Sequence, residues 1–118
     1  MSEQASHLEV SREGGVTVVR FADRKILDEI PIAEIGEHLT NLAGSEPRIK
    51  MLLDFENVEH LSSAVLSMLI NLNKRVGEQR GKLKLANIKP QIYEVFKITR
   101  LNELFDIHDT TASAKKSY

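Results

Sequence analysis

The residues best suited to chemistry lie in one polar stretch near the middle of the chain, where His60 is followed by Ser62 and Ser63. A serine becomes a nucleophile when a histidine takes its proton, but an acid that orients the histidine and an oxyanion hole are also required. Proximity along the sequence supplies neither. We therefore interpret His60 as a surface loop residue and predict that the chain is not an enzyme.

Asp54 ends an apolar run, which is where response-regulator receivers carry the aspartate that accepts phosphate. A receiver also needs an acidic pair after its first strand. Asp23 and Asp28 do not provide this pair, because a predicted hairpin precedes them. We therefore interpret Asp54 as the residue that turns the chain out of a sheet.

The sequence gives no indication of a metal, a cofactor or a nucleic acid. Its four histidines lack metal-ligand spacing, and it has no cysteine and no P-loop or dinucleotide glycine motif. The formal net charge of -1 provides no global attraction for nucleic acid. The polar start and the lack of an apolar run of about 20 residues favour a cytoplasmic location without membrane contact.

The elements that must position the polar stretch can be predicted from glycines and apolar spacing. Gly14 and Gly15 predict a hairpin of strands 8–13 and 16–22. A charged loop over 22–29 precedes a helix that begins at Pro31 and ends at Gly44. Its apolar residues recur at steps of three, four and three: Ile32, Ile35, Leu39, Leu42.

The second half of the chain alternates between strands and helices. An almost unbroken apolar run over 49–55 predicts a central strand that is buried on both faces. A long helix over 63–80 follows, and residues 82–88 alternate as in a strand with one wet face. Pro90 begins a helix that carries Ile92, Val95 and Phe96, and Leu104, Phe105 and Ile107 predict a last strand.

This order predicts a single α/β domain over 1–118, in which an opening hairpin and parallel strands form a mixed sheet packed with about four α-helices. Residues 110–118 have little apolar surface, so we expect at most a weak final helix there. Residues 1–7 and 110–118 are expected to be flexible ends.

The long helix has two different faces at 100° per residue. Its core stripe comprises Val65, Leu69, Leu72 and Val76. Its exposed line comprises Ser63, Ser67, Ile70 and Lys74. Ser62 precedes the helix and suits an N-cap whose oxygen accepts a backbone hydrogen bond.

The segment from Leu53 to Leu66 reads Leu-Asp-Phe-Glu-Asn-Val-Glu-His-Leu-Ser-Ser-Ala-Val-Leu and resembles the central signature of STAS domains. These are anti-sigma-factor antagonists and related modules of stressosome proteins and anion transporters. Residues 22–28, 82–88 and 95–105 also resemble the family. Three positions depart from its usual pattern, since Ser62 replaces an aspartate, Ala64 a second serine and Val65 a glycine.

The resemblance implies a bacterial, non-catalytic regulator with a STAS-like sheet, which binds a kinase-type anti-sigma factor. Ser63 aligns with the serine that such kinases phosphorylate. The expected partner-binding surface comprises Asn57, Glu59, His60, Ser62, Ser63, Ser67, Ile70 and Lys74. The alternative is a scaffold or oligomer subunit of a stressosome-like assembly that is not phosphorylated.

Overall fold

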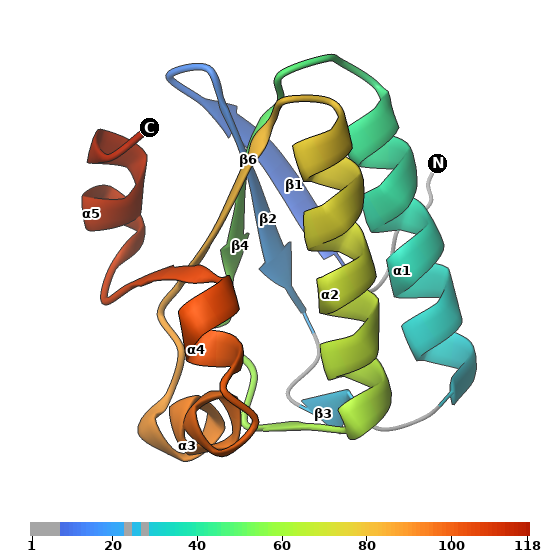
Figure 1. Cartoon of the computed structure of the whole chain (residues 1–118), viewed down its shortest axis with the longest axis vertical. Helices are drawn as coiled ribbons and strands as arrows, with labels where there is room; N and C mark the ends of the chain where they lie inside the picture. Colours follow the sequence, from blue (N-terminus) through green and yellow to red (C-terminus); the bar gives the residue numbers. More distant parts are fainter. Residues whose placement is uncertain (1–7, 23–24, 27–28) are drawn as a thin grey trace.

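The computed structural model describes residues 8–22, 25–26 and 29–118, and a five-stranded sheet runs through their centre (Figure 1). The strand order is β1-β2-β4-β6-β7. The first pair is antiparallel and the remaining neighbours are parallel. The strand bounds are β1 Leu8–Glu13, β2 Val16–Phe21, β4 Lys50–Asp54, β6 Lys82–Ala86 and β7 Asp106–His108. The predicted mixed sheet is therefore confirmed.

The opening hairpin turns at Gly14 and Gly15, whose φ angles are 59° and 84°. Positive φ at both central residues is what a two-residue hairpin turn of this twist requires, and glycine adopts it without steric cost. The register pairs Glu13 with Val16 and Leu8 with Phe21. The predicted hairpin is confirmed, with the second strand ending one residue earlier than expected.

Two long helices cover one face of the sheet, as Figure 1 shows. They are α1, Glu29–Gly44, and α2, Ser63–Glu78, and they pack against each other. Helix α1 begins two residues before Pro31, so the predicted start was slightly late. Helix α3, Pro90–Ile98, begins at the predicted proline and is followed by the short α4, Leu101–Leu104.

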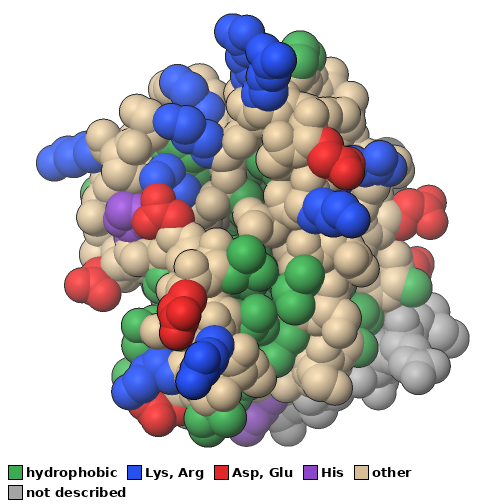
Figure 2. All heavy atoms as spheres, in the orientation of Figure 1, with side chains coloured by type: hydrophobic (Ala, Val, Ile, Leu, Met, Phe, Trp, Pro, Cys, Tyr) green, Lys and Arg blue, Asp and Glu red, His purple; other side chains and the backbone are tan. Residues whose placement is uncertain are grey.

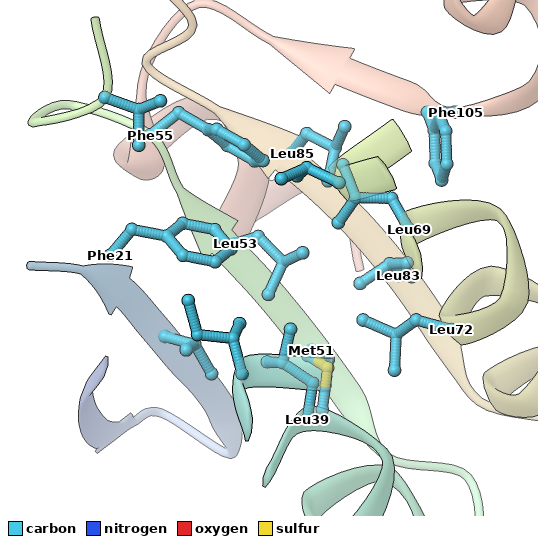
Figure 3. Close-up of a cluster of buried hydrophobic side chains, with 14 of the residues drawn as sticks. Phe21, Leu39, Met51, Leu53, Phe55, Leu69, Leu72, Leu83, Leu85 and Phe105 are labelled. Atoms are coloured by element: carbon cyan, nitrogen blue, oxygen red, sulfur yellow. The ribbon is translucent and has the colours of Figure 1, made fainter. Parts of the chain in front are cut away.

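The main core lies between the sheet and the α1–α2 layer (Figure 3). Leu39 of α1, Leu53 of β4 and Leu69 of α2 are each 0% exposed. Leu52, which points to the other face of β4, is also 0% exposed. The prediction of a central strand buried on both faces is therefore confirmed.

The opposite face of the sheet is covered by α5, Thr111–Lys116. The prediction of a wet face on the strand at 82–88 was wrong, because Lys84 is only 7% exposed. The Lys84 ammonium pairs with Asp106 and lies 5.1 Å from the centre of the Tyr118 ring. Burial and the charge of Asp106 raise the pKa of the Tyr118 phenol, and the Tyr118 hydroxyl donates a hydrogen bond to the Met51 carbonyl oxygen.

The expected flexibility of residues 110–118 stays a prediction.

The last strand begins later than the sequence indicated. Leu104 lies in α4, Phe105 is buried in the main core, and β7 begins at Asp106. Between α3 and α4 stands Arg100, the N-cap residue of α4, whose φ of 62° interrupts the helical backbone conformation. A second small difference is a pair of two-residue strands, β3 Lys25–Ile26 and β5 His60–Leu61. The rest of the predicted loop at 23–24 and 27–28 lies outside the described residues.

Candidate functional site

The polar stretch lies at the carboxyl edge of the parallel strands, between the end of β4 and the start of α2. β4 ends at Asp54, residues 55–59 form a loop, and β5 leads directly into α2. β5 pairs in parallel with β3, in the register His60 with Lys25 and Leu61 with Ile26. This pairing gives the segment before α2 a backbone anchor that the sequence did not indicate.

Asp54 lies at the start of the loop, and its carboxylate is buried, with 1% of the residue exposed. Its Oδ1 accepts hydrogen bonds from the Glu56 backbone N at 2.9 Å and from Asn87 Nδ2 at 3.0 Å. Its Oδ2 accepts one from Arg20 Nε at 3.3 Å. Burying a charge is costly unless it is bonded in this way. Asp54 therefore ties the ends of β2, β4 and β6 together, in line with its interpretation as a turning residue.

The donors around Asp54 are themselves held in place. The hydrogen bond and charge of Asp54 raise the pKa of Arg20 further, so that side chain stays cationic. Asn87 follows β6 with a φ of 59°, a left-handed conformation that asparagine tolerates better than most residues. The backbone bend at Asn87 thus lets its amide reach a neighbouring strand.

Residues 55–59 have two further anchors. Asn57 Nδ2 donates to the Phe21 carbonyl oxygen at 3.3 Å, and the Lys89 ammonium donates to the Glu56 carbonyl oxygen. Asn57 was predicted to contact a partner, but its side chain is half-buried and bonded inside the protein. This bond helps to hold the loop, and the role of Asn57 in partner binding stays a prediction.

The side chains of α2 point to the core or to the surface as the spacing of its apolar residues predicts. Val65, Leu69, Leu72 and Val76 are buried. Ser63, Ser67 and Lys74 are exposed, and Ile70 is 39% exposed. Together with exposed His60 and half-buried Glu59, they form a surface that continues from the loop along the helix. Their role in binding a partner stays a prediction.

The predicted cap by the Ser62 side chain was wrong. Ser62 occupies the N-cap position with an extended backbone, φ −96° and ψ 168°, but its side chain makes no capping bond. Its hydroxyl oxygen is buried and finds no hydrogen-bond partner among the residues that the structure describes. The first turn of α2 also has no acidic residue. The positive end of α2 beside Ser63 is thus left without a side-chain acceptor.

A hollow of about 460 Å³ lies beside this surface, between α1 and α2. Ala64, Ser67 and Met68 line it from α2, and Gly36 lines it from α1. A β-carbon at Gly36 would lie 3.1 Å from Cγ of Met68, so the small residue lets the two helices approach. Within the described part of the chain, no group of three His, Cys, Asp or Glu side chains could hold a metal ion.

Sequence reasoning missed the anchoring residues Arg20, Asn87 and Lys89. A usable signal was present, because Arg20 and Asn87 lie at the ends of two strands that flank the one ending in Asp54. Polar residues at the carboxyl ends of neighbouring parallel strands meet at one edge of the sheet. The strand order, which the sequence does not state, was needed to bring the three together.

Comparison with known proteins identifies the domain. The STAS domain family model matches residues 7–114. BtrV of Bordetella bronchiseptica, named as a candidate anti-sigma factor antagonist, is 26% identical over 69 residues, covering 58% of this chain. The match spans 60% of the length of that relative.

Solved structures show the same fold. An anti-sigma-factor antagonist (STAS) domain protein from Planctomyces limnophilus has a TM-score of 0.83 and 25% identity, covering 91% of this chain and 93% of that one. The Bacillus cell fate determinant SpoIIAA in its phosphorylated form has a TM-score of 0.69 and 12% identity, with coverage of 94% and 99%. Among the described residues, no helix is both long and apolar enough to cross a membrane. Because the family model accounts for residues 7–114, this chain belongs to the STAS domain family.

Proposed function

We propose that this chain is an anti-sigma factor antagonist that binds a kinase-type anti-sigma factor through the start of α2 and the loop before it. The main support is Ser63, an exposed serine in the first turn of a helix that directly follows an anchored loop. The relatives named as anti-sigma factor antagonists support the same role. Binding would sequester the anti-sigma factor and release its sigma factor, with no catalysis by this chain.

Phosphate on Ser63 would act as a switch of surface charge. It adds about −1.5 to −2 charges, and a helix N-terminus stabilises an exposed anion by roughly 0.3–1 kcal/mol. The first turn has neither a side-chain cap nor an acidic residue to compete with it. SpoIIAA, which shares this fold, is described in a phosphorylated form. The helix would thus keep its structure while the new charge repels an acidic partner surface.

The test is a comparison of wild type, Ser63→Asp and Ser63→Ala in calorimetric binding to a purified kinase-type anti-sigma factor. We expect Ser63→Asp to weaken binding about tenfold, a change of ~1.4 kcal/mol, and Ser63→Ala to stay within about twofold. Gln91→Asp places the same charge on an exposed position of α3 and is the control. Mass spectrometry after incubation with the kinase and ATP should locate phosphate on Ser63. Equal affinity for all three proteins would contradict the switch.

A second function is favoured by the departures from the family pattern. Ser62 stands where the family usually has an aspartate, and its buried hydroxyl offers no substitute carboxylate to a kinase. The domain would then act as an unphosphorylated scaffold or oligomer subunit. Size-exclusion chromatography with light scattering separates the two functions, since a large stable assembly supports the scaffold and a monomer supports the antagonist.

A further inference from the structure

Two neighbouring turns at the amino edge of the parallel strands each carry an exposed arginine and lead to an exposed lysine. Arg48 and Lys50 lie at the start of β4, and Arg80 and Lys82 lie at the start of β6. We call these four residues the basic cluster. Figure 2 shows Lys and Arg side chains gathered at the top of the view, which is the end at which α1 and α2 finish in Figure 1. The basic cluster and Ser63 therefore lie at opposite ends of α2.

Backbone contacts hold the two turns against each other. Arg48 N donates to the Gln79 carbonyl oxygen at 3.0 Å, and Lys82 N donates to the Ile49 carbonyl oxygen at 2.8 Å. A β-carbon at Gly81 would lie 2.7 Å from that same Ile49 oxygen, so glycine is needed for this close approach. The segments that carry the basic cluster are thus in direct contact and form one surface.

Lys50 and Lys82 form a like-charge pair on neighbouring strands. They are register partners, and adjacent strands lie about 4.8 Å apart. Both point to the sheet face that carries Leu52, yet both are exposed. Like charges that lie opposite each other in a sheet are destabilising. Two residues further along β6, Lys84 bonds to Asp106, but β7 begins at Asp106 and has no residue opposite Lys82. An anionic ligand would supply the missing counter-charge.

Both arginines occupy backbone positions that favour glycine. The φ angle is 57° at Arg48 and 62° at Arg80. Arg80 follows the end of α2 and its N donates to the Gly77 carbonyl oxygen at 3.0 Å, in a helix ending where glycine is the usual left-handed residue. The fold therefore keeps a less favourable residue at two adjacent turns, and each one places a guanidinium group on the surface.

The carboxylates nearby do not cancel the charge of the basic cluster. Segments 44–50 and 74–82 together contain six cations and two carboxylates, although the whole chain has a net charge of -1. Glu46 bonds to Arg12 at 2.7 Å, and Glu78 is exposed in the last turn of α2. Among the described residues, no member of the basic cluster forms an ion pair.

Helix dipoles explain only part of this excess of positive charge. The carboxyl end of a helix favours cations within its last turn, and both α1 and α2 end beside the basic cluster. Arg75 lies in the last turn of α2 and fits this explanation. Lys50 and Lys82 lie in strands and point to the sheet face away from both helices. Their exposed charges need another explanation.

We propose that the basic cluster binds an acidic segment of a partner protein, whose carboxylates bridge the two turns. An arginine donates two parallel hydrogen bonds to a carboxylate, and a lysine adds a point charge. A carboxylate between Lys50 and Lys82 also removes their repulsion. This inference goes beyond the proposed function, because the surface lies at the end of α2 remote from Ser63 and leaves the start of the helix free for the first partner.

An acidic protein segment fits better than a nucleic acid or a lipid surface. Segments 44–50 and 78–82 contain no aromatic residue on which a base could stack or which could anchor the chain at a membrane interface. Four cations also fall short of the roughly 6–10 phosphate contacts that strong duplex binding uses. Side chains one turn apart on a helix lie about 5–6 Å apart, which is close to the spacing of neighbouring strands. One acidic helix face can therefore reach both turns.

The test uses two labelled helical peptides of equal length, which carry either glutamate or glutamine at every fourth position of one face. Fluorescence anisotropy measures their affinity for the full chain, and backbone amide NMR locates the contact. We expect the glutamate peptide to bind about tenfold more tightly and to shift amide signals of residues 48–50 and 80–82. Because the contact is ionic and exposed, added salt should weaken it severalfold.

Glycine substitutions separate the loss of charge from a loss of folding. Arg48→Gly combined with Arg80→Gly should weaken binding of the glutamate peptide about tenfold, yet raise the melting temperature by a few degrees, because glycine suits positive φ. Lys50→Gln combined with Lys82→Gln should weaken binding to a similar extent without lowering the melting temperature. Arg100→Gly is the matched control, because it removes an exposed arginine with a φ of 62° outside the basic cluster. It should change affinity less than about twofold.

The proposal is overturned if the two peptides bind equally, if neither binds, or if the amide shifts lie elsewhere. It is also overturned if Arg100→Gly weakens binding as much as the double variants do. Tighter binding of a DNA duplex or of phosphatidylserine vesicles, abolished by the same double variants, would replace the acidic segment with another partner. Ser63→Asp should leave the affinity for the glutamate peptide within about twofold, so failure of the basic cluster and failure of the Ser63 switch are observed separately.

Discussion

The two faces of the central sheet are covered in different ways. On one face, α1 and α2 bury a large cluster of apolar side chains. On the other, the six-residue α5 covers a small cluster that comprises Val16, Val18, Leu52, Ala86 and Ala114. Beside that small cluster lies a polar group of Lys84, Asp106 and His108. The difference indicates that the first face supplies most of the stability and that the second depends on specific polar bonds.

Leu53 and Leu52 offer the sharpest comparison, since they are neighbours on β4, point to opposite faces and are both 0% exposed. We expect Leu53→Ala to lower the free energy of unfolding by about 3–5 kcal/mol, because long helices limit the collapse of the cavity. Leu52→Ala should cost roughly 2–3 kcal/mol, because a short helix can move toward the gap. Urea unfolding measures both, and equal losses would contradict the proposed difference between faces.

The polar group of Lys84, Asp106 and His108 predicts that the stability contributed by the second face depends on pH. The hydrogen bond from Lys84 is the largest effect on Asp106 and lowers its pKa, and His108 Nε2 lies 2.9 Å from its Oδ1. A carboxyl with a depressed folded-state pKa contributes stability above its unfolded pKa of about 3.9, and this is lost as the pH falls through the folded value. Stability should therefore fall as the pH drops below about 4.

Asp106→Asn should weaken the loss of stability at acid pH. It should also lower the free energy of unfolding at pH 7 by about 1 kcal/mol, a modest value because the Asp106 side chain is 51% exposed. Adding Lys84→Met to Asp106→Asn should restore much of the lost stability, because an apolar side chain suits a position that is 7% exposed. Urea titrations from pH 7 to pH 3 measure these effects. An unchanged acid slope in Asp106→Asn would show that other carboxyls are responsible.

Tyr118→Phe should give the smallest loss of stability among these variants. The variant keeps the ring beside Lys84 and removes the hydroxyl that donates to the Met51 carbonyl oxygen. One neutral hydrogen bond contributes about 0.5–1.5 kcal/mol, so we expect a loss within that range. Thermal unfolding followed by circular dichroism is the measurement, with Tyr93→Phe on α3 as the control. A loss as large as that of Leu53→Ala would contradict a minor role for this bond.

The sequence by itself determined the elements whose signals are local. Gly14 and Gly15 fix the hairpin because few other residues tolerate positive φ at two successive positions. The apolar run before Asp54 predicts a strand buried on both faces, and the spacing of Val65, Leu69 and Leu72 predicts the faces of α2. The exposure of Ser63 followed from that same spacing. Each inference required information from one short segment only.

The tertiary structure decided everything that depends on contact between distant segments. Lys84 alternates with apolar residues as on a wet strand face, yet α5 and Tyr118 bury it from the far end of the chain. The Ser62 hydroxyl, predicted to cap α2, makes no capping bond and is buried without a hydrogen-bond partner among the described residues. Asp54 became an anchor because the strand order brings Arg20 and Asn87 to it. Side-chain periodicity reports which face a residue takes, whereas the packing of remote elements decides what that face contacts.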